Sequence, residues 1–239
     1  MRTVITIAVC LLFSFATAQT KIEKTFPVKG NQNIALKFDY PHIKVSTWDK
    51  HEIQISGTAN INNNENNSAF EIMESQTGNT YTVQGIIPEF KNLPHTITVK
   101  NGNQKLTFKS KEELDQYSKN TNTTFKTMSN GVDIDIQLEI KVPKGLKTQI
   151  DSVYGMVEIK NFNGEITVNA PYGGIDATIL EKNVGKLSAE TSYGQIYTNL
   201  DTKFTGKEID DFHTSISSFP GTGSNCTLES KYGNIYLRK

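Results

Sequence analysis

A tyrosine followed by glycine recurs in the second half of this chain of 239 residues. Tyrosine carries a flat apolar ring with a hydroxyl at one edge, so a row of tyrosines can contact a sugar or a partner protein. A histidine takes the tyrosine place once, in the segment Phe212-His213-Thr214. The residues predicted to bind a ligand through such a row are Tyr154, Tyr172, Tyr193, His213, Tyr232, Tyr197 and Tyr236.

The spacing of this row predicts a structural repeat. Positions 154, 172, 193, 213 and 232 are separated by 18, 21, 20 and 19 residues. Such a period is typical of architectures in which each repeat buries its apolar face only by stacking on the next. Glycines at positions 155, 164, 173, 185 and 194 divide each repeat into two arms. Two short strands with a corner between them describe one rung of a β-solenoid.

The direction of the tyrosine side chains depends on how the chain passes the glycine. If the strand runs straight through Gly155, then Val157 lies on the inner face and Tyr154 on the outer face. Stacked strands lie about 4.8 Å apart, so outward rings would form a stacking platform for a ligand. If the glycine marks a bend or bulge instead, the alternation shifts and the tyrosines pack inward. The sequence leaves both arrangements open.

A second group of polar residues has the composition needed for acid–base or metal chemistry. Glu208, Asp210, Asp211 and His213 are close in sequence, and carboxylates with a histidine can bind zinc or exchange protons. The other histidines are scattered at positions 42, 51 and 95, without the spacing of a metal motif. We therefore predict no metal site and no cofactor, and we expect a solvated corner here.

Two further carboxylates are candidates for catalysis. Asp133 and Asp135 alternate with apolar residues, so they are expected to share the outward face of one strand. Carboxylates on such a face can serve a polysaccharide-cleaving site. However, the chain has no arginine between Arg2 and Arg238, which argues against an arginine-assisted lyase. We predict no catalytic residue, and a polysaccharide lyase or hydrolase is the less favoured alternative.

The N-terminus has the pattern of a secretory signal peptide over residues 1–18. Arg2 precedes an apolar run at residues 4–15, and Ala16-Thr17-Ala18 matches the small-residue cleavage pattern. Cleavage there leaves a mature chain that begins at Gln19. We therefore expect an exported protein, located in the periplasm, on the outer surface or outside the cell.

Composition excludes several classes of protein. Basic and acidic residues both number 25, so the formal net charge is zero and no basic surface for nucleic acid is expected. The N-terminal apolar run is shorter than the roughly 20 residues of a membrane span, so the protein is not expected to span a membrane. Cys10 would leave with the signal peptide, and Cys226 alone cannot form a disulfide framework. We expect Cys226 to be a buried thiol and not a nucleophile.

The strand pattern predicts an all-β chain in which residues 19–239 form a single domain. Residues 132–142 show the longest alternation of apolar and polar side chains, and residues 132–239 carry the regular repeats. Residues 86–130 depart from the repeat and are predicted to be an insertion.

The insertion has local signals of its own. Asn101-Gly102 predicts the turn of a hairpin, and Ser110 with Glu113 forms a capping box for a short helix over residues 111–118.

The predicted fold is a right-handed parallel β-solenoid (β-helix) with rungs of about 20 residues. Its N-terminal part is expected to be irregular, and the inserted hairpin and short helix interrupt it.

Three segments carry a resemblance to a known family. They are the Val142-Pro143-Lys144-Gly145 turn, the Gly-x-Ile/Val arms that follow it, and Val45-Ser46-Thr47-Trp48-Asp49. Together they resemble the DUF4097 family of bacterial β-helical proteins, which carries an adhesin label. The resemblance is best over residues 132–239 and weaker over residues 33–59. It implies a bacterial envelope protein exposed at the cell surface, with no catalytic residues to carry over.

This chain departs from that family in two respects. Tyrosine precedes the repeat glycines, where such repeats often carry asparagine or another small polar residue, and residues 86–130 form a long insert. We expect a non-catalytic, exported, adhesin-like cell-envelope protein with a binding or structural role. The alternative is a carbohydrate-binding module that uses an exposed tyrosine ladder. A surface glycan or an envelope protein is the expected partner, and the ligand itself is left open.

Overall fold

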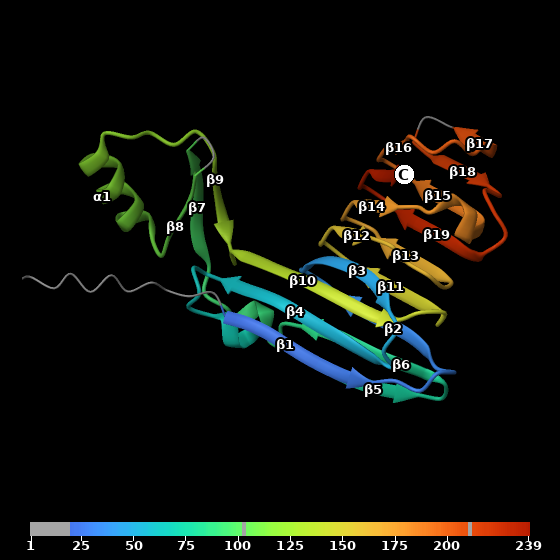
Figure 1. Ribbon diagram of the computed structural model, residues 1–239. Coiled ribbons are helices and arrows are strands. Elements are labelled where there is room, and N and C mark those ends of the chain that lie inside the picture. The colour runs from blue at the N-terminus through green and yellow to red at the C-terminus, as the bar shows by residue number, and fades with distance from the viewer. Residues whose placement is uncertain (1–19, 102–103, 210–211) are drawn as a thin grey trace, which may run out of the picture.

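The computed structural model describes residues 20–101, 104–209 and 212–239. The predicted signal peptide lies outside the described residues. Most of the described chain is β-strand, which confirms the predicted all-β class. Figure 1 shows an elongated body of two β-sheets, from which a smaller sheet and one helix project. No helix in the described part of the chain is long and apolar enough to cross a lipid bilayer.

Two open sheets, named sheet A and sheet B here, form the body. Sheet A contains, in spatial order, β1 (Thr20–Pro27), β4 (Glu52–Ile61), β10 (Ile134–Pro143), β3 (His42–Trp48), β12 (Val157–Ile159), β14 (Ile175–Thr178), β20 (Ile235–Arg238) and β16 (Ile196–Thr198). Sheet B contains β17 (Thr205–Ile209), β18 (Thr214–Ser218), β15 (Val184–Thr191), β19 (Ser224–Ser230), β13 (Ile166–Ala170), β11 (Thr148–Ser152), β2 (Asn33–Phe38), β6 (Thr80–Ile86) and β5 (Glu71–Thr77). Within the described residues, short 3-10 helices lie at Asn67–Ala69, Phe90–Asn92 and Glu181–Asn183.

The chain passes repeatedly from sheet B to sheet A, and we call each such pair of strands a rung. The rungs are β2–β3, β11–β12, β13–β14, β15–β16 and β19–β20, and neighbouring rungs pair in parallel. Equivalent apolar side chains stack inside, as Val157, Ile175 and Ile235 do in sheet A, where all three are fully buried. Burying one such side chain stabilises the fold by about 1.5–3 kcal/mol.

The parallel pairing predicted for a β-solenoid is present between the five rungs but not throughout either sheet. Antiparallel pairs occur at both ends of the body, between β1, β4 and β10 in sheet A and between β15, β18 and β17 in sheet B. The segment at residues 212–216 is therefore not a further parallel rung, although its spacing fits the repeat. A short connection joins β17 to β18 and favours their antiparallel pairing, so β18 runs back and also pairs antiparallel with β15.

The rungs are not stacked in the order in which they follow along the chain. Rung β19–β20 comes last in sequence but lies between β13–β14 and β15–β16 in both sheets. Each rung presents a similar corner and similar inward side chains, so the repeat itself does not select its neighbours. Strand β18 occupies one edge of β15, and β19 consequently pairs with the other edge.

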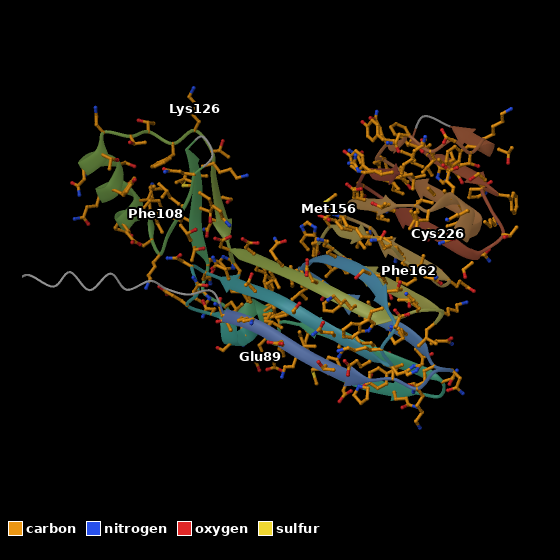
Figure 2. The ribbon with its side chains drawn as sticks, in the orientation of Figure 1. Glu89, Phe108, Lys126, Met156, Phe162 and Cys226 are labelled. Atoms are coloured by element: carbon orange, nitrogen blue, oxygen red, sulfur yellow. The ribbon has the colours of Figure 1, made fainter. Side chains whose placement is uncertain are left out.

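The predicted insertion forms an arm with a small core of its own. Strands β8 (Gln104–Phe108), β7 (Thr96–Asn101) and β9 (Met128–Gly131) form the third sheet, with helix α1 (Lys111–Thr121) beside it. These elements confirm the predicted hairpin and helix, and the Ser110 Oγ accepts a hydrogen bond from the Glu113 N–H at 3.3 Å. Val99, Phe108 and Leu114 form the arm's core, separate from that of the body. Figure 2 shows Phe108 within the arm, between its strands and the helix.

One buried asparagine fixes the base of the arm to the body. The Asn62 Nδ2 donates to the Pro94 carbonyl at 2.8 Å, and its Oδ1 accepts from the Asp133 N–H at 2.9 Å. Pro94 lies just before the arm and Asp133 just after it, so one side chain holds both ends of the insertion together.

Candidate functional site

The Tyr-Gly pairs lie at the corners where each rung passes from sheet B to sheet A. A Cβ atom added to Gly173 would lie 2.0 Å from the Gly155 carbonyl oxygen, and one added to Gly233 would lie 1.9 Å from the Gly173 oxygen. Such distances are far below van der Waals contact. The corners therefore stack directly on one another, and glycine is required for that close approach.

At three of the four Tyr-Gly corners a buried hydroxyl three residues before the glycine satisfies a corner carbonyl, whereas Ala170 takes that place before Gly173. The Ser230 Oγ donates to the Gly173 carbonyl at 3.1 Å, and the Thr191 Oγ1 donates to the Gly233 carbonyl at 3.0 Å. Ser152 takes the same place in its own rung. A carbonyl buried without a partner costs about 1–3 kcal/mol, so this hydroxyl belongs to the corner motif. The sequence interpretation missed the serine or threonine, although its constant spacing from the glycine is a usable signal.

The aromatic residues beside these corners form one continuous stack, which we call the aromatic ladder. Its members, in spatial order, are Phe90, Tyr40, Tyr154, Tyr172, Tyr232, Tyr193 and Phe212. From Phe90 to Tyr193 the centroids of neighbouring rings lie 5.0 to 5.5 Å apart, with planes inclined by 9° to 24°. Phe212 is tilted by 47° against Tyr193 at 5.8 Å.

The ladder faces outward, which is one of the two arrangements that the sequence left open. Tyr154 and Tyr193 are each 57% exposed and Tyr172 is 56% exposed, whereas Gly155 and Val157 are buried. The alternation of outward and inward residues therefore continues across the glycine, although the chain bends at residues 153–155. Hydrophobic burial consequently falls on the residues after the glycine, and the rings stay at the surface.

Stacking decides which part of each ring a ligand can reach. Rings whose centroids are about 5 Å apart cover each other's faces, and a sugar ring cannot enter between them. Ring edges and hydroxyl groups are left for contact along the length of the ladder. Burial, with the nearby Asp39 carboxylate and the Tyr154 phenol, raises the pKa of Tyr40 above its ordinary value. Its hydroxyl therefore stays protonated and can donate a hydrogen bond at neutral pH.

Three residues of the predicted row lie outside the ladder. Tyr197 and Tyr236 stack on each other at 5.1 Å on the outer face of sheet A, where the Arg238 guanidinium lies 5.1 Å from the Tyr236 ring. The His213 Nε2 lies 3.6 Å from the Glu190 Oε1, and Phe212 takes the ladder position expected for His213. The antiparallel course of β18 accounts for this change of residue, because the strand enters the corner from the opposite direction.

Besides Phe212, two members of the ladder that the prediction omitted come from the N-terminal half. Tyr40 stacks on Tyr154 at 5.5 Å, and Phe90 stacks on Tyr40 at 5.1 Å. Tyr40 precedes Pro41, which takes the glycine position, so its sequence context resembles the later corners. Phe90 has no such context and belongs to a 3-10 helix, so only the tertiary structure places it there.

The carboxylates considered for catalysis are engaged with other groups. Asp133 forms an ion pair with Lys105 and accepts a hydrogen bond from the Thr107 Oγ1 at 3.1 Å. Asp135 accepts from the Gln137 Nε2 at 2.8 Å. Asp210 and Asp211 lie outside the described residues. Within the described residues, no three His, Cys, Asp or Glu side chains form a group that could hold a metal ion.

A polar cleft of about 290 Å³ on sheet A brings acids and bases together. The His42 Nε2 lies 3.1 Å from the Glu158 Oε1. The other carboxylate oxygen of Glu158, Oε2, lies 3.4 Å from the Lys160 Nζ. The Lys44 Nζ lies 3.3 Å from the Glu139 Oε1. Each carboxylate thus has a basic side chain as its partner on a neighbouring strand, which is typical of a surface polar network.

Cys226 is a buried free thiol, as the sequence predicts, with 3% of its surface exposed. Burial raises the pKa of this thiol to about 12. The thiolate is the reactive form, so the native thiol should be inert near neutral pH. We expect an aromatic disulfide reagent to leave the native protein unlabelled at pH 8 and to label it rapidly in urea, with Cys226→Ala as the unlabelled control.

The same thiol makes the free energy of unfolding depend on pH in the alkaline range. Its folded pKa lies above the unfolded value of about 8.5, so the buried protonated thiol stabilises the fold below that pH. This contribution is lost as the pH rises towards about 12. Urea unfolding at pH 8 and pH 10 should show a smaller pH-dependent loss in Cys226→Ala than in the wild type. Rapid labelling of the native thiol at pH 8, or equal losses, would contradict this.

Comparison with known proteins gives little further guidance. No protein-family model matches the sequence, and no curated protein matches it. A "putative cell adhesion protein" from Clostridium sporogenes is 12% identical with a TM-score of 0.42, over 92% of this chain and 99% of that one. A "putative adhesin" from Bacteroides fragilis is 11% identical with a TM-score of 0.22, over 92% of this chain and 98% of the other. Similarities this low carry no argument about this chain.

Proposed function

We propose that this protein is a non-catalytic, adhesin-like binding protein exported to the bacterial cell envelope, with the aromatic ladder as its recognition surface. The single observation that carries the proposal is the row of exposed, stacked rings along the corners of successive rungs. We propose further that residues 33–48, 148–198 and 224–238 constitute a right-handed β-solenoid, on the support of their parallel rungs. Export rests on the signal-peptide pattern at residues 1–18.

Rigidity supports a binding role for the ladder. Each tyrosine of the ladder is held between two neighbouring rings, and all but Tyr40 directly precede a glycine packed at a corner, so little side-chain freedom is left to lose on binding. Immobilising a flexible side chain costs about 0.5–1.5 kcal/mol at an interface. A preordered ladder avoids this cost, and exposed tyrosine is among the residues that dominate interface energies.

A surface glycan is the favoured ligand. A line of phenol hydroxyls offers hydrogen bonds to sugar hydroxyls, while the ring edges contact the apolar C–H groups of the sugar. Lys231 lies 5.4 Å from the Tyr232 ring, so the middle of the ladder also carries a cation that suits acidic sugars. An envelope protein is the second candidate, since the same stripe of aromatic surface fits a protein interface.

A glycan-array screen of the mature chain, residues 19–239, tests the proposal. The variant Tyr172→Ala/Tyr193→Ala removes the rings on both sides of Tyr232, whereas Tyr172→Phe/Tyr193→Phe keeps the stack and removes only two hydroxyls. We expect the alanine variant to lose binding and the phenylalanine variant to weaken it about tenfold, which corresponds to about 1.4 kcal/mol from lost hydrogen bonds.

Phe219→Ala removes an exposed aromatic side chain outside the ladder and serves as the control. Circular dichroism and thermal unfolding establish that each variant is folded. If the folded alanine variant still binds glycan, the aromatic ladder is not the binding site. If the wild type binds no glycan, pull-down of envelope proteins with the same variants tests the second candidate.

A further inference from the structure

The two sheets end unequally at the C-terminal end of the stack. Sheet B continues past β15 with β18 and β17, whereas sheet A stops at β16. Figure 1 shows these two strands of sheet B at the top of the body, beyond the last rung. Strand β16 pairs only with β20 among the described strands, so its other edge is open.

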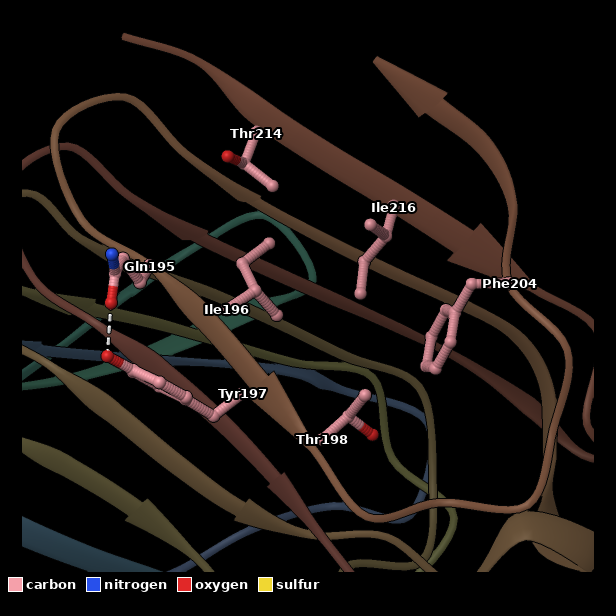
Figure 3. A pocket seen from close by; sticks show the side chains of 7 residues that line it. All are labelled: Gln195, Ile196, Tyr197, Thr198, Phe204, Thr214 and Ile216. Atoms are coloured by element: carbon pink, nitrogen blue, oxygen red, sulfur yellow. Dashed lines mark hydrogen bonds between the residues drawn. The ribbon is translucent and has the colours of Figure 1, made fainter. Parts of the chain in front are cut away.

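An apolar groove lies between this open edge and the overhanging strand. Its volume is about 420 Å³, and its lining consists of Gln195, Ile196, Tyr197, Thr198, Phe204, Thr214 and Ile216. Figure 3 shows the side chains of Ile196, Ile216 and Phe204 turned toward the same space. The lining contains no charged residue, so the groove favours an uncharged, partly apolar occupant.

Ile196 stands at a core position that lacks its covering layer. In the other rungs the equivalent residues Ile175 and Ile235 are fully buried, but Ile196 is partly exposed. An apolar side chain from one more strand beside β16 would complete the burial of Ile196.

The main chain of β16 also offers unused hydrogen-bonding groups. The Gln195 carbonyl accepts from the Ile235 N–H at 2.9 Å, and the Asn199 N–H donates to the Leu237 carbonyl at 3.2 Å, both toward β20. In a strand, alternate residues direct these groups to opposite edges. The N–H and C=O groups of Ile196 and Thr198 therefore face the groove, where an extended peptide can pair with them.

The opposite end of sheet A is built differently. Its edge strand β1 carries Lys21, Lys24 and Pro27, and Lys24 lies opposite the buried Ile55 in the β1–β4 pair. Charged residues and proline on an edge strand prevent pairing with other chains. Strand β16 has neither, so its edge lacks this protection. Pairing of β16 with the middle of β1 of a second copy would bring Lys24 against the apolar groove, which disfavours a head-to-tail stack through sheet A.

We propose that the groove binds an extended, uncharged β-strand of a partner polypeptide, which pairs in parallel with β16 and covers Ile196 and Ile216. Strand β20 on the other edge of β16 provides the pattern, since its inward residues Ile235 and Leu237 alternate with outward ones. Strand addition of this kind takes its affinity from main-chain hydrogen bonds and its specificity from alternate side chains. This site is separate from the aromatic ladder and does not depend on it.

The test uses the mature chain and a fluorescent peptide with the sequence of residues 170–179, in which Asp176 is replaced by asparagine so that its side chains carry no charge. That segment supplies the inward pattern Ile175, Ala177, Ile179 of an existing rung. Fluorescence anisotropy should show saturable binding, and hydrogen exchange should show added protection at Ile196 and Thr198. Replacing Ile175 of the peptide by lysine should weaken binding at least tenfold.

Two protein variants form a matched pair on β18. Thr214→Lys places a charge in the groove, whereas Ser215→Lys places it on the opposite face of the same strand. We expect at least a tenfold loss of peptide binding in the first and less than a twofold change in the second. Glycan binding through the ladder should be unchanged in both variants, so failure of this proposal can be distinguished from failure of the proposed function.

Absence of saturable binding, or equal binding by both lysine variants, would overturn the proposal. Analytical ultracentrifugation tests whether a second copy of this chain occupies the groove instead. If the protein forms a concentration-dependent dimer that Thr214→Lys abolishes, the groove binds a second copy of this chain. That result would also overturn the proposal.

Discussion

Replacing Gly233 by alanine is expected to lower the free energy of unfolding by about 3 kcal/mol or more. The added Cβ would lie 1.9 Å from the Gly173 carbonyl oxygen and 2.5 Å from its carbon. These are backbone atoms at a corner where two rungs pair, so they cannot move without breaking the backbone hydrogen bonds between the adjacent strands. Urea unfolding monitored by circular dichroism measures the change.

Gly30→Ala is the matched control, because a Cβ added there would have no heavy atom within 4 Å and the backbone is not in the left-handed region. We expect this variant to change stability by less than about 1 kcal/mol. A loss in Gly233→Ala that is no larger than in Gly30→Ala would show that the rungs can separate at the corner.

Deleting residues 219–239 is expected to unfold the C-terminal half of the body. The deletion removes β19 and β20, which lie inside their sheets with partner strands on both sides. Leu228, Ile235 and Leu237 are buried there, and loss of each large core side chain costs about 2–5 kcal/mol. Their sum is comparable with the entire stability of a typical domain, about 5–15 kcal/mol.

Hydrogen exchange should locate the effect of this deletion. We expect loss of amide protection over β15 and β18, which come earlier in the sequence and would lose their contact with the rest of the stack. A truncated chain that keeps this protection would show that β15–β16 can pair directly with β13–β14. The observed rung order would then be one of two stable arrangements.

A larger deletion in the arm is the matched control. Thr98 and Ser129 are direct partners across β7 and β9, so residues 99–128 can be replaced by an Asn-Gly turn. This change removes the arm's separate core but none of the body's core residues. We expect the unfolding temperature of the body to stay within a few degrees of the wild type, although more residues are lost than in the C-terminal deletion.

The sequence by itself determined the local features of this protein. Alternation of apolar and polar residues predicts strands such as β10, and the inward position of Val157 follows from its distance to Gly155. Both depend on side-chain direction along a single strand, which has a period of two residues. The capping box before α1 is local in the same sense, because its hydrogen bond joins residues three apart.

Only the tertiary structure decided how the repeats are assembled. Similar corners can stack in any order, so spacing along the chain could not show that Tyr232 lies between Tyr172 and Tyr193. Nor could it show that Phe90 continues the aromatic ladder, because this contact joins distant segments. The groove beside β16 exists because sheet B extends past sheet A, and the place where a sheet ends depends on every strand that pairs within it. Local periodicity determines which way a side chain points, whereas long-range pairing determines what it meets.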